Sequence, residues 1–244
     1  MKFCITLLFL VCAVGGPLPV QQAQDKPPQF DVEKYQFGLL KRGPKWTPES
    51  TPETQKLQEG HMANINKMAR MGKLMAAGPI GGNGVLRGIF IFKAASLEEA
   101  QALAAADPAI QAERLMIDIV DWYGPKGIGV KVQEELKSGV EPKYTMTKYF
   151  LVLLSQGANV SAANTPENQK LQLAHLWYIR RQLDAKAFVA AGPFGGKSDL
   201  LGNFIIAANS PEEAKALADA DPRVKAGQLA VEIHPWWSAK EVWP

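Results

Sequence analysis

Residues 51–58 read TPETQKLQ, and residues 165–172 read TPENQKLQ. The two stretches start 114 positions apart, and the same offset relates many other residues without a gap. The recurring positions are His61 and His175, Gly78-Pro79 and Gly192-Pro193, Gly81-Gly82 and Gly195-Gly196, Asp107-Pro108 and Asp221-Pro222, and Trp122 and Trp236. Repetition at a fixed spacing is typical of a duplicated structural unit, so we predict two copies of one unit.

The repeat divides the chain into five parts. We expect a signal peptide at 1–16, a flexible N-terminal segment at 17–33, a first repeat at 34–123, a linker at 124–147 and a second repeat at 148–244. Glycine, proline and charged residues fill most of the linker, which shows no apolar period. Its length suits two units that pack side by side.

Each copy alternates strand and helix patterns in a fixed order. In the second copy the expected elements are a strand at 149–154, a helix capped by Thr165, a hairpin of strands at 188–191 and 201–207, a helix opened by the capping box at 210–213, and a strand at 230–233. The order βαββαβ predicts one antiparallel sheet with helices on one face. Because the other face is apolar, we expect the two repeats to pair within the chain and bury it.

The N-terminus is typical of a secretory signal. Lys2 precedes an apolar run from Phe3 to Val14, which is too short to span a bilayer stably. Both cysteines, Cys4 and Cys12, lie inside this segment, so the mature chain has none for disulfides, thiolate metal sites or nucleophiles. We expect a secreted or periplasmic protein with no membrane span after signal removal.

Charge and histidine content exclude several classes of site. The chain has 27 basic and 24 acidic residues with no basic stripe, so we expect no nucleic-acid partner. The mature chain offers only His61, His175 and His234 and no cysteine, so we expect no metal site. No cofactor is expected either.

A loose nucleotide-binding pattern needs separate treatment. Residues 191–198 read AGPFGGKS, which fits a relaxed Walker A motif, and the first repeat has AGPIGGNG at 77–84. A phosphate-binding loop must lead into a helix, whereas a strand pattern follows here. We therefore interpret both stretches as glycine hairpin turns that need positive φ angles.

Five motifs in register, present twice, resemble the YciI-like (YCII-related) family. They are His-Met or His-Leu early in the first helix, Ala-Gly-Pro closing the second strand, Ser-x-Glu-Glu-Ala opening the second helix, Asp-Pro, and a final strand ending near Trp. The resemblance implies an α+β fold, in which two ferredoxin-like βαββαβ repeats pack as a single-chain dimeric α+β barrel. It also implies a His and Asp pair facing a pocket, and some relatives are linked to dehydrochlorination or lactone chemistry.

The resemblance places candidate catalytic pairs in both repeats. They are His61 with Asp107, and His175 with Asp221. The chain departs from the family after Asp-Pro, where Ala109 and Arg223 stand in place of the usual aromatic residue. The wall of each pocket is therefore altered.

Two interpretations of the pairs remain open at the level of sequence. His61 lies four residues from both Leu57 and Ile65, on the helix face that meets the sheet, where a carboxylate could fix its tautomer for acid or base work. Alternatively, Asp107 only caps a short helix and His61 is a satisfied core residue. Capping and catalysis do not exclude each other.

We expect a protein that binds a small cyclic or aromatic molecule near His61 and His175. A proton transfer of the lyase or isomerase type would extend that role. The alternative is a non-catalytic interaction or structural module of the cell envelope. Divergence between the repeats, such as Arg87 against Leu201, suggests that the two pockets are no longer equivalent.

Overall fold

The computed structural model describes residues 26–160, 165–196 and 198–244. The expected signal peptide at 1–16 lies outside the described residues, as does most of the segment at 17–33. Within the described ranges, no helix combines the length and the apolar character needed to cross a membrane.

Both repeats have the same order of elements. The first repeat contains β1 (Val32–Arg42), α1 (Pro52–Arg70), β2 (Leu74–Pro79), β3 (Leu86–Phe92), α2 (Leu97–Ala105), α3 (Pro108–Gln111) and β4 (Leu115–Pro125). The second contains β5 (Met146–Gln156), α5 (Pro166–Asp184), β6 (Phe188–Pro193), β7 (Leu200–Ile206), α6 (Pro211–Asp219), α7 (Pro222–Lys225) and β8 (Leu229–Ala239). Two further elements are α4 (Val130–Lys137), which lies between the repeats, and the 3-10 turn η1 (Lys240–Val242), which follows β8.

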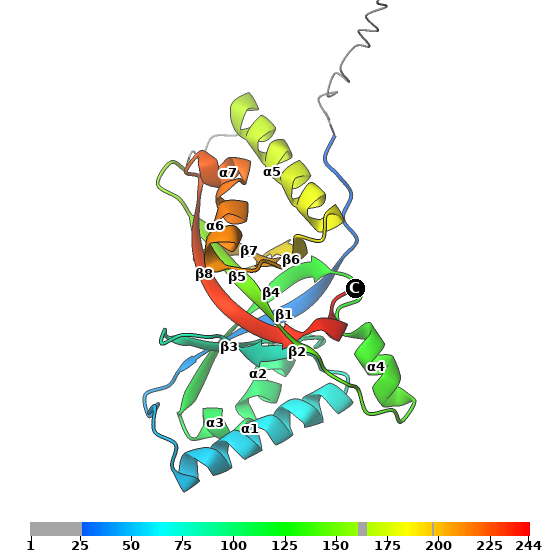
Figure 1. Cartoon of the computed structure of the whole chain (residues 1–244), viewed down its shortest axis with the longest axis vertical. Coiled ribbons are helices and arrows are strands. Elements are labelled where there is room, and N and C mark those ends of the chain that lie inside the picture. Colours follow the sequence, from blue (N-terminus) through cyan, green and yellow to red (C-terminus); the bar gives the residue numbers. More distant parts are fainter. Residues whose placement is uncertain (1–25, 161–164, 197) are drawn as a thin grey trace, which may run out of the picture.

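Each repeat forms one four-stranded antiparallel sheet. The strand orders are β2-β3-β1-β4 and β6-β7-β5-β8. In each sheet the first strand of the repeat pairs with the last one, which lies at the edge: β1 with β4, and β5 with β8. The helices of each repeat cover the outer face of its own sheet, and the two sheets lie between them (Figure 1). This arrangement confirms the predicted α+β class.

The two sheets join at both edges. β2 meets β8 through an antiparallel bridge between Ile80 and Trp236, and β4 meets β6 through Trp122 and Phe194. At each joint a glycine N–H donates to a backbone oxygen of the other repeat at 2.8 Å, from Gly81 in one case and Gly195 in the other. The predicted pairing of the repeats within one chain is therefore confirmed, and the result is a single closed barrel.

The hydrophobic core has three layers. The largest cluster fills the barrel and takes residues from both repeats, including Phe37, Ile91, Leu151, Ile205 and the two fully buried indoles of Trp122 and Trp236. The other two clusters lie between each sheet and its helices. Trp236 Nε1 donates to the Gly78 carbonyl at 3.1 Å, so this tryptophan helps to join the two repeats.

The glycine stretches form hairpin turns, as interpreted from the sequence. β6 pairs antiparallel with the next strand, β7, and the described residues between them (194–196, 198 and 199) form no helix that could hold a phosphate. Gly82 and the equivalent Gly196 have φ angles of +84° and +76°. Only a residue without Cβ adopts that region at little cost, which explains the repeated glycine pair.

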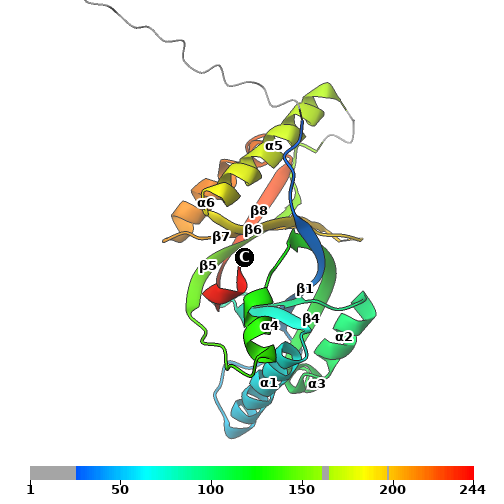
Figure 2. The ribbon, with the colours of Figure 1, turned by 90° about the vertical axis from the view of Figure 1, so that its right-hand side faces the viewer.

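The segment between the repeats contains a helix that the sequence did not predict. Val132 and Gln133 of α4 are buried, and Gln133 Nε2 donates to the Ala69 carbonyl at the end of α1 at 2.9 Å. Figure 2 shows α4 beside α1, close to the C-terminus of the chain. The linker therefore packs on the first repeat and also connects it to the second.

Candidate functional site

The first repeat brings His61 and Asp107 into direct contact. His61 lies in the middle of α1, and its Nδ1 is 2.8 Å from Asp107 Oδ2. The imidazole stacks on Phe90 of β3 with a centroid distance of 5.8 Å and an interplanar angle of 17°. The ring is 11% exposed and the carboxylate is fully buried.

Asp107 also caps the short helix α3. Its Oδ1 accepts a hydrogen bond from the Ala109 N–H at 2.9 Å, and Asn64 Nδ2 donates to Oδ2 at 3.3 Å. The two alternatives left open by the sequence therefore coexist, because one carboxylate oxygen caps the helix and the other meets the histidine.

Burial alone would raise the pKa of the Asp107 carboxyl. Its hydrogen bonds from His61, the Ala109 N–H and Asn64 outweigh that effect and hold the pKa below its usual value. Asp107 is therefore ionised at neutral pH and can only accept hydrogen bonds. It follows that the proton between the two groups belongs to His61 Nδ1, and that Nε2 of a neutral ring carries the free lone pair.

The second repeat has an equivalent pair with different surroundings. His175 Nδ1 lies 2.6 Å from Asp221 Oδ2, and Asp221 Oδ1 accepts from the Arg223 N–H at 2.9 Å. At the position of Asn64 this repeat has Tyr178, whose hydroxyl donates to the Leu217 carbonyl at 2.6 Å and not to the aspartate. Burial raises the pKa of Tyr178 to about 12.

A cavity of about 540 Å³ lies beside His61 in the first repeat. Its apolar wall includes Leu57, Met62 and Phe90, and its polar lining includes Gln58, Arg87 and Arg114. Residues from outside the first repeat also line it, namely Val132 of α4, Tyr144 just before β5, Met146 at the start of β5, and Ala239 and Val242 near the C-terminus. The size and mainly apolar lining are typical of small-molecule sites.

In the second repeat an arginine crosses the corresponding space. Ala109, Gln58 and Arg114 all line the cavity of the first repeat. Their counterparts in the second repeat are Arg223, Gln172 and Gln228, respectively. These three are hydrogen-bonded to one another, because Arg223 donates to Gln172 Oε1 at 2.8 Å and to Gln228 Oε1 at 3.2 Å. The substitution of Ala109 by Arg223 thus places a hydrogen-bonded side chain where the first repeat has open volume.

His234, the third histidine, belongs to neither His–Asp pair. Its Nε2 lies 3.0 Å from Glu232 on the same strand. Within the described ranges, no cluster of three or more histidine, cysteine, aspartate or glutamate side chains could hold a metal ion.

Three features of the site were not identified from the sequence. They are the contact of Asn64 with Asp107, the packing of Trp46 at the cavity, and the part that Arg114 plays in its lining. Comparison of the repeats could have revealed them, since the counterparts of Asn64, Trp46 and Arg114 are Tyr178, Val160 and Gln228.

Comparison with known families agrees with the duplication. The model of the YCII-related domain matches this chain twice, at residues 44–122 and 149–237. A search of curated proteins gives no match.

Solved structures share the overall architecture. A mutant chlorite dismutase from Candidatus Nitrospira defluvii aligns over 86% of this chain and 92% of that chain, with a TM-score of 0.55 and 12% identity. The same enzyme in complex with imidazole aligns over 87% and 92%, with a TM-score of 0.54 and 12% identity. Similarity at this level of identity shows a shared fold and nothing more.

Proposed function

The chain belongs to the YCII-related domain family, and on that premise we propose that its first repeat binds a small cyclic or aromatic molecule in the cavity beside His61. The observation that carries this proposal is the geometry of the imidazole. His61 lines the cavity while Asp107 engages its Nδ1, and Nε2 makes no hydrogen bond to any of the described residues.

The same geometry supports proton transfer as the chemistry of the site. An ionised Asp107 fixes the Nδ1–H tautomer, so Nε2 can accept a proton from a bound molecule and later return it. Asp107 stabilises the imidazolium that forms in between, because the two groups are 2.8 Å apart and shielded from solvent. A lyase or isomerase step needs such a group next to an acidic C–H or O–H.

The second repeat has a different role in this proposal. Arg223 is hydrogen-bonded to Gln172 and Gln228, whose counterparts Gln58 and Arg114 line the cavity of the first repeat. In this proposal the second repeat is therefore the scaffold that completes the barrel and supplies Met146, Ala239 and Val242 to the working cavity. The structural module considered as an alternative thus describes the second repeat better than the first.

The binding test uses the second repeat as a template for closing the cavity. Ala109→Arg combined with Arg114→Gln reproduces the Arg223 arrangement, since Gln58 already matches Gln172. Wild-type protein is screened by ligand-observed NMR against small cyclic acids, lactones and halogenated phenols. We expect compounds that bind the wild type to lose binding to the double variant, and to keep at least part of it in the control Arg114→Gln.

Two results would contradict the proposal. One is that no compound of these classes binds the wild type. The other is that compounds bind the double variant as well as they bind the wild type, while its circular dichroism and melting temperature show that it is folded.

Turnover is the second part of the test. Each compound that binds is incubated with the protein and followed by mass spectrometry. We expect His61→Ala to reduce conversion by about 100-fold or more, as for loss of a general base. His175→Ala is the matched control and should change conversion little.

We also propose that the protein is exported, on the strength of the apolar run that follows Lys2. Cells that produce the full chain with a C-terminal tag are fractionated. If the protein is exported, the full chain should give a shortened product outside the cytoplasm. A variant that lacks residues 2–16 should stay in the cytoplasm.

A further inference from the structure

Three arginines surround one tryptophan at the cavity of the first repeat. The guanidinium carbon of Arg42 lies 3.9 Å from the centre of the Trp46 ring, that of Arg87 5.7 Å and that of Arg114 6.0 Å. Trp46, Arg87 and Arg114 all line the cavity that contains His61.

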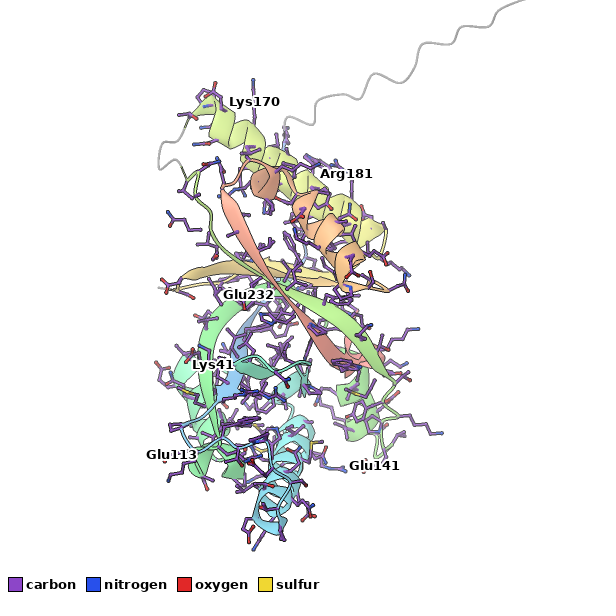
Figure 3. The ribbon with its side chains drawn as sticks, turned by 60° about the vertical axis from the view of Figure 1, so that its left-hand side comes forward. Lys41, Glu113, Glu141, Lys170, Arg181 and Glu232 are labelled. Carbon is purple, nitrogen blue, oxygen red and sulfur yellow. The ribbon has the colours of Figure 1, made fainter. Side chains whose placement is uncertain are left out.

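These positive charges are not balanced by acidic side chains. Among the described residues, no carboxylate forms an ion pair with any of the three guanidiniums. The nearby Glu113, on the outer side of the first repeat in Figure 3, is paired with Lys45 at 2.8 Å. Like charges that lie close together repel one another, and an anion bound among them would relieve that repulsion.

The hydrogen bonds made by the three arginines leave some of their N–H groups free to donate. Arg114 donates to Thr47 through both terminal nitrogens, at 3.0 Å and 2.7 Å, whereas Arg87 uses only one, on the Gly82 carbonyl at 2.9 Å. Arg42 Nε is buried and has no partner among the described residues. Burial and the charge of Arg42 both lower the pKa of Arg87.

The second repeat has none of this arrangement. The counterparts of Arg42, Trp46, Arg87 and Arg114 are Gln156, Val160, Leu201 and Gln228. The cluster therefore appears in the repeat with the open cavity and is missing where Arg223 crosses that space. A purely structural role in the barrel would be needed equally in both copies.

We propose that the ligand of the first repeat is an organic anion, whose carboxylate or phosphate group binds Arg87 and Arg114 while its ring lies against the apolar wall near His61. This inference rests on the proposed function and names its ligand class. Planar guanidiniums bind carboxylate and phosphate oxygens in pairs, and partial burial strengthens those hydrogen bonds. The anionic group fixes the orientation in which the rest of the molecule meets His61 Nε2.

The test compares three probes that share one ring system: 2-naphthoate, 2-naphthyl phosphate and the neutral 2-naphthamide. Affinities are measured by calorimetry, and the ring protons of His61 and the Nε–H groups of the arginines are followed by NMR. We expect at least one anion to bind about tenfold or more tightly than the amide, with added salt weakening the anion alone. The stronger of the two anions identifies the acidic group.

The variants again follow the second repeat. Arg87→Leu and Arg114→Gln should each weaken the anion about tenfold and leave the amide unchanged. The control is the double variant Lys170→Gln/Arg181→Gln, which removes two exposed charges from α5 at the far end of the molecule (Figure 3) and should alter neither affinity.

The outcomes separate this inference from the proposed function. If the amide binds as tightly as both anions and shifts the His61 signals, the cavity is a ligand site but the anion inference is wrong. If the arginine variants weaken amide and anion equally, the arginines shape the cavity and do not recognise charge, which also overturns the inference. If none of the probes binds, the inference is wrong for aromatic anions, while the broader screen still decides the proposed function.

Discussion

At the scale of single residues, the Asp107 carboxylate has two partners with different requirements. One oxygen accepts from the backbone at the start of α3, and the other accepts from His61 and Asn64. A carboxylate is the side chain that can serve all of them, since each partner donates. The charge of this carboxylate therefore links the capping of α3 to the protonation state of the His61 imidazole.

Asp107→Asn should lower the free energy of unfolding by about 1–3 kcal/mol at pH 7, because charge-assisted hydrogen bonds are replaced by neutral ones. Folding lowers the pKa of Asp107 below its ordinary 3.8. The ionised carboxylate therefore contributes fully to the free energy of unfolding well above pH 3.8, and this contribution is lost as the pH falls through the lowered pKa of the folded state. Urea unfolding at pH 7 and at successively lower pH measures the difference between variant and wild type, which should shrink in acid.

The control is Asp219→Asn, which breaks an exposed i,i+4 ion pair with Lys215 on α6. Pairs of this kind contribute about 0.3–0.5 kcal/mol. A difference for Asp107→Asn that is as small as this, or that stays constant as the pH falls below 3.8, would contradict the role assigned to the carboxylate.

At the scale of elements, α4 begins at a glycine whose backbone conformation and close contacts leave no room for a side chain. Gly129 begins the helix with φ at +74°, and its N–H donates to the Val242 carbonyl at 2.7 Å. A Cβ at this position would lie 2.8 Å from the Met75 carbonyl oxygen. This contact brings α4, β2 and η1 together on the side of the cavity that Val132 and Val242 line.

Gly129→Ala should therefore destabilise the protein by more than the cost of a positive φ angle, which is about 1 kcal/mol. Gly139→Ala is the matched control, because Gly139 has φ at +77° and nothing within 4 Å of an added Cβ. We expect the loss of unfolding free energy, measured by urea titration, to be larger for Gly129→Ala. Equal losses would mean that the close approach to Met75 is easily relieved.

The elements of the repeats were predictable because local signals and packing agree. Thr51 and Asp107 cap the helices that they precede, and the apolar strands have the length and flanks expected of a half-buried sheet. α4 was not predictable in the same way. Its sequence is short and charged between glycines, and its buried face exists only because α1 and η1 lie next to it.

At the scale of the whole molecule, the barrel closes through glycines at equivalent places in the two repeats. A Cβ on Gly78 would lie 1.8 Å from the Trp237 carbonyl oxygen, and one on Gly192 would lie 2.0 Å from that of Tyr123. Both approaches are to backbone of the other repeat, which cannot move aside without opening the joint between the sheets.

Gly78→Ala and Gly192→Ala should each cost about 3 kcal/mol or more, because either substitution disrupts a joint that the shared core depends on. Gly84→Ala is the control, since nothing lies within 4 Å of its added Cβ. Calorimetry should show one unfolding transition for the wild type. Two separate transitions would mean that the repeats fold independently, and full stability in both variants would mean that the joints accommodate an added Cβ.

The duplication made the barrel predictable, and differences between the repeats, such as Arg87 against Leu201, already suggested that the two pockets are not equivalent. The structure brings each histidine to its aspartate. What the motifs do not indicate is how the surroundings differ: Arg223 is hydrogen-bonded to Gln172 and Gln228, whereas its counterpart Ala109 lines the cavity beside His61. Such a difference depends on the path of a long side chain in three dimensions, which a motif does not contain.

The most direct test of the central claim is the tautomer of His61, read from long-range ¹⁵N–¹H correlations of the imidazole ring at a pH where it is neutral. The account requires a proton on Nδ1 and a free lone pair on Nε2, with this preference weakened in Asp107→Asn. A neutral ring that carries its proton on Nε2 would contradict the account, since His61 could then not accept a proton from a ligand in the cavity.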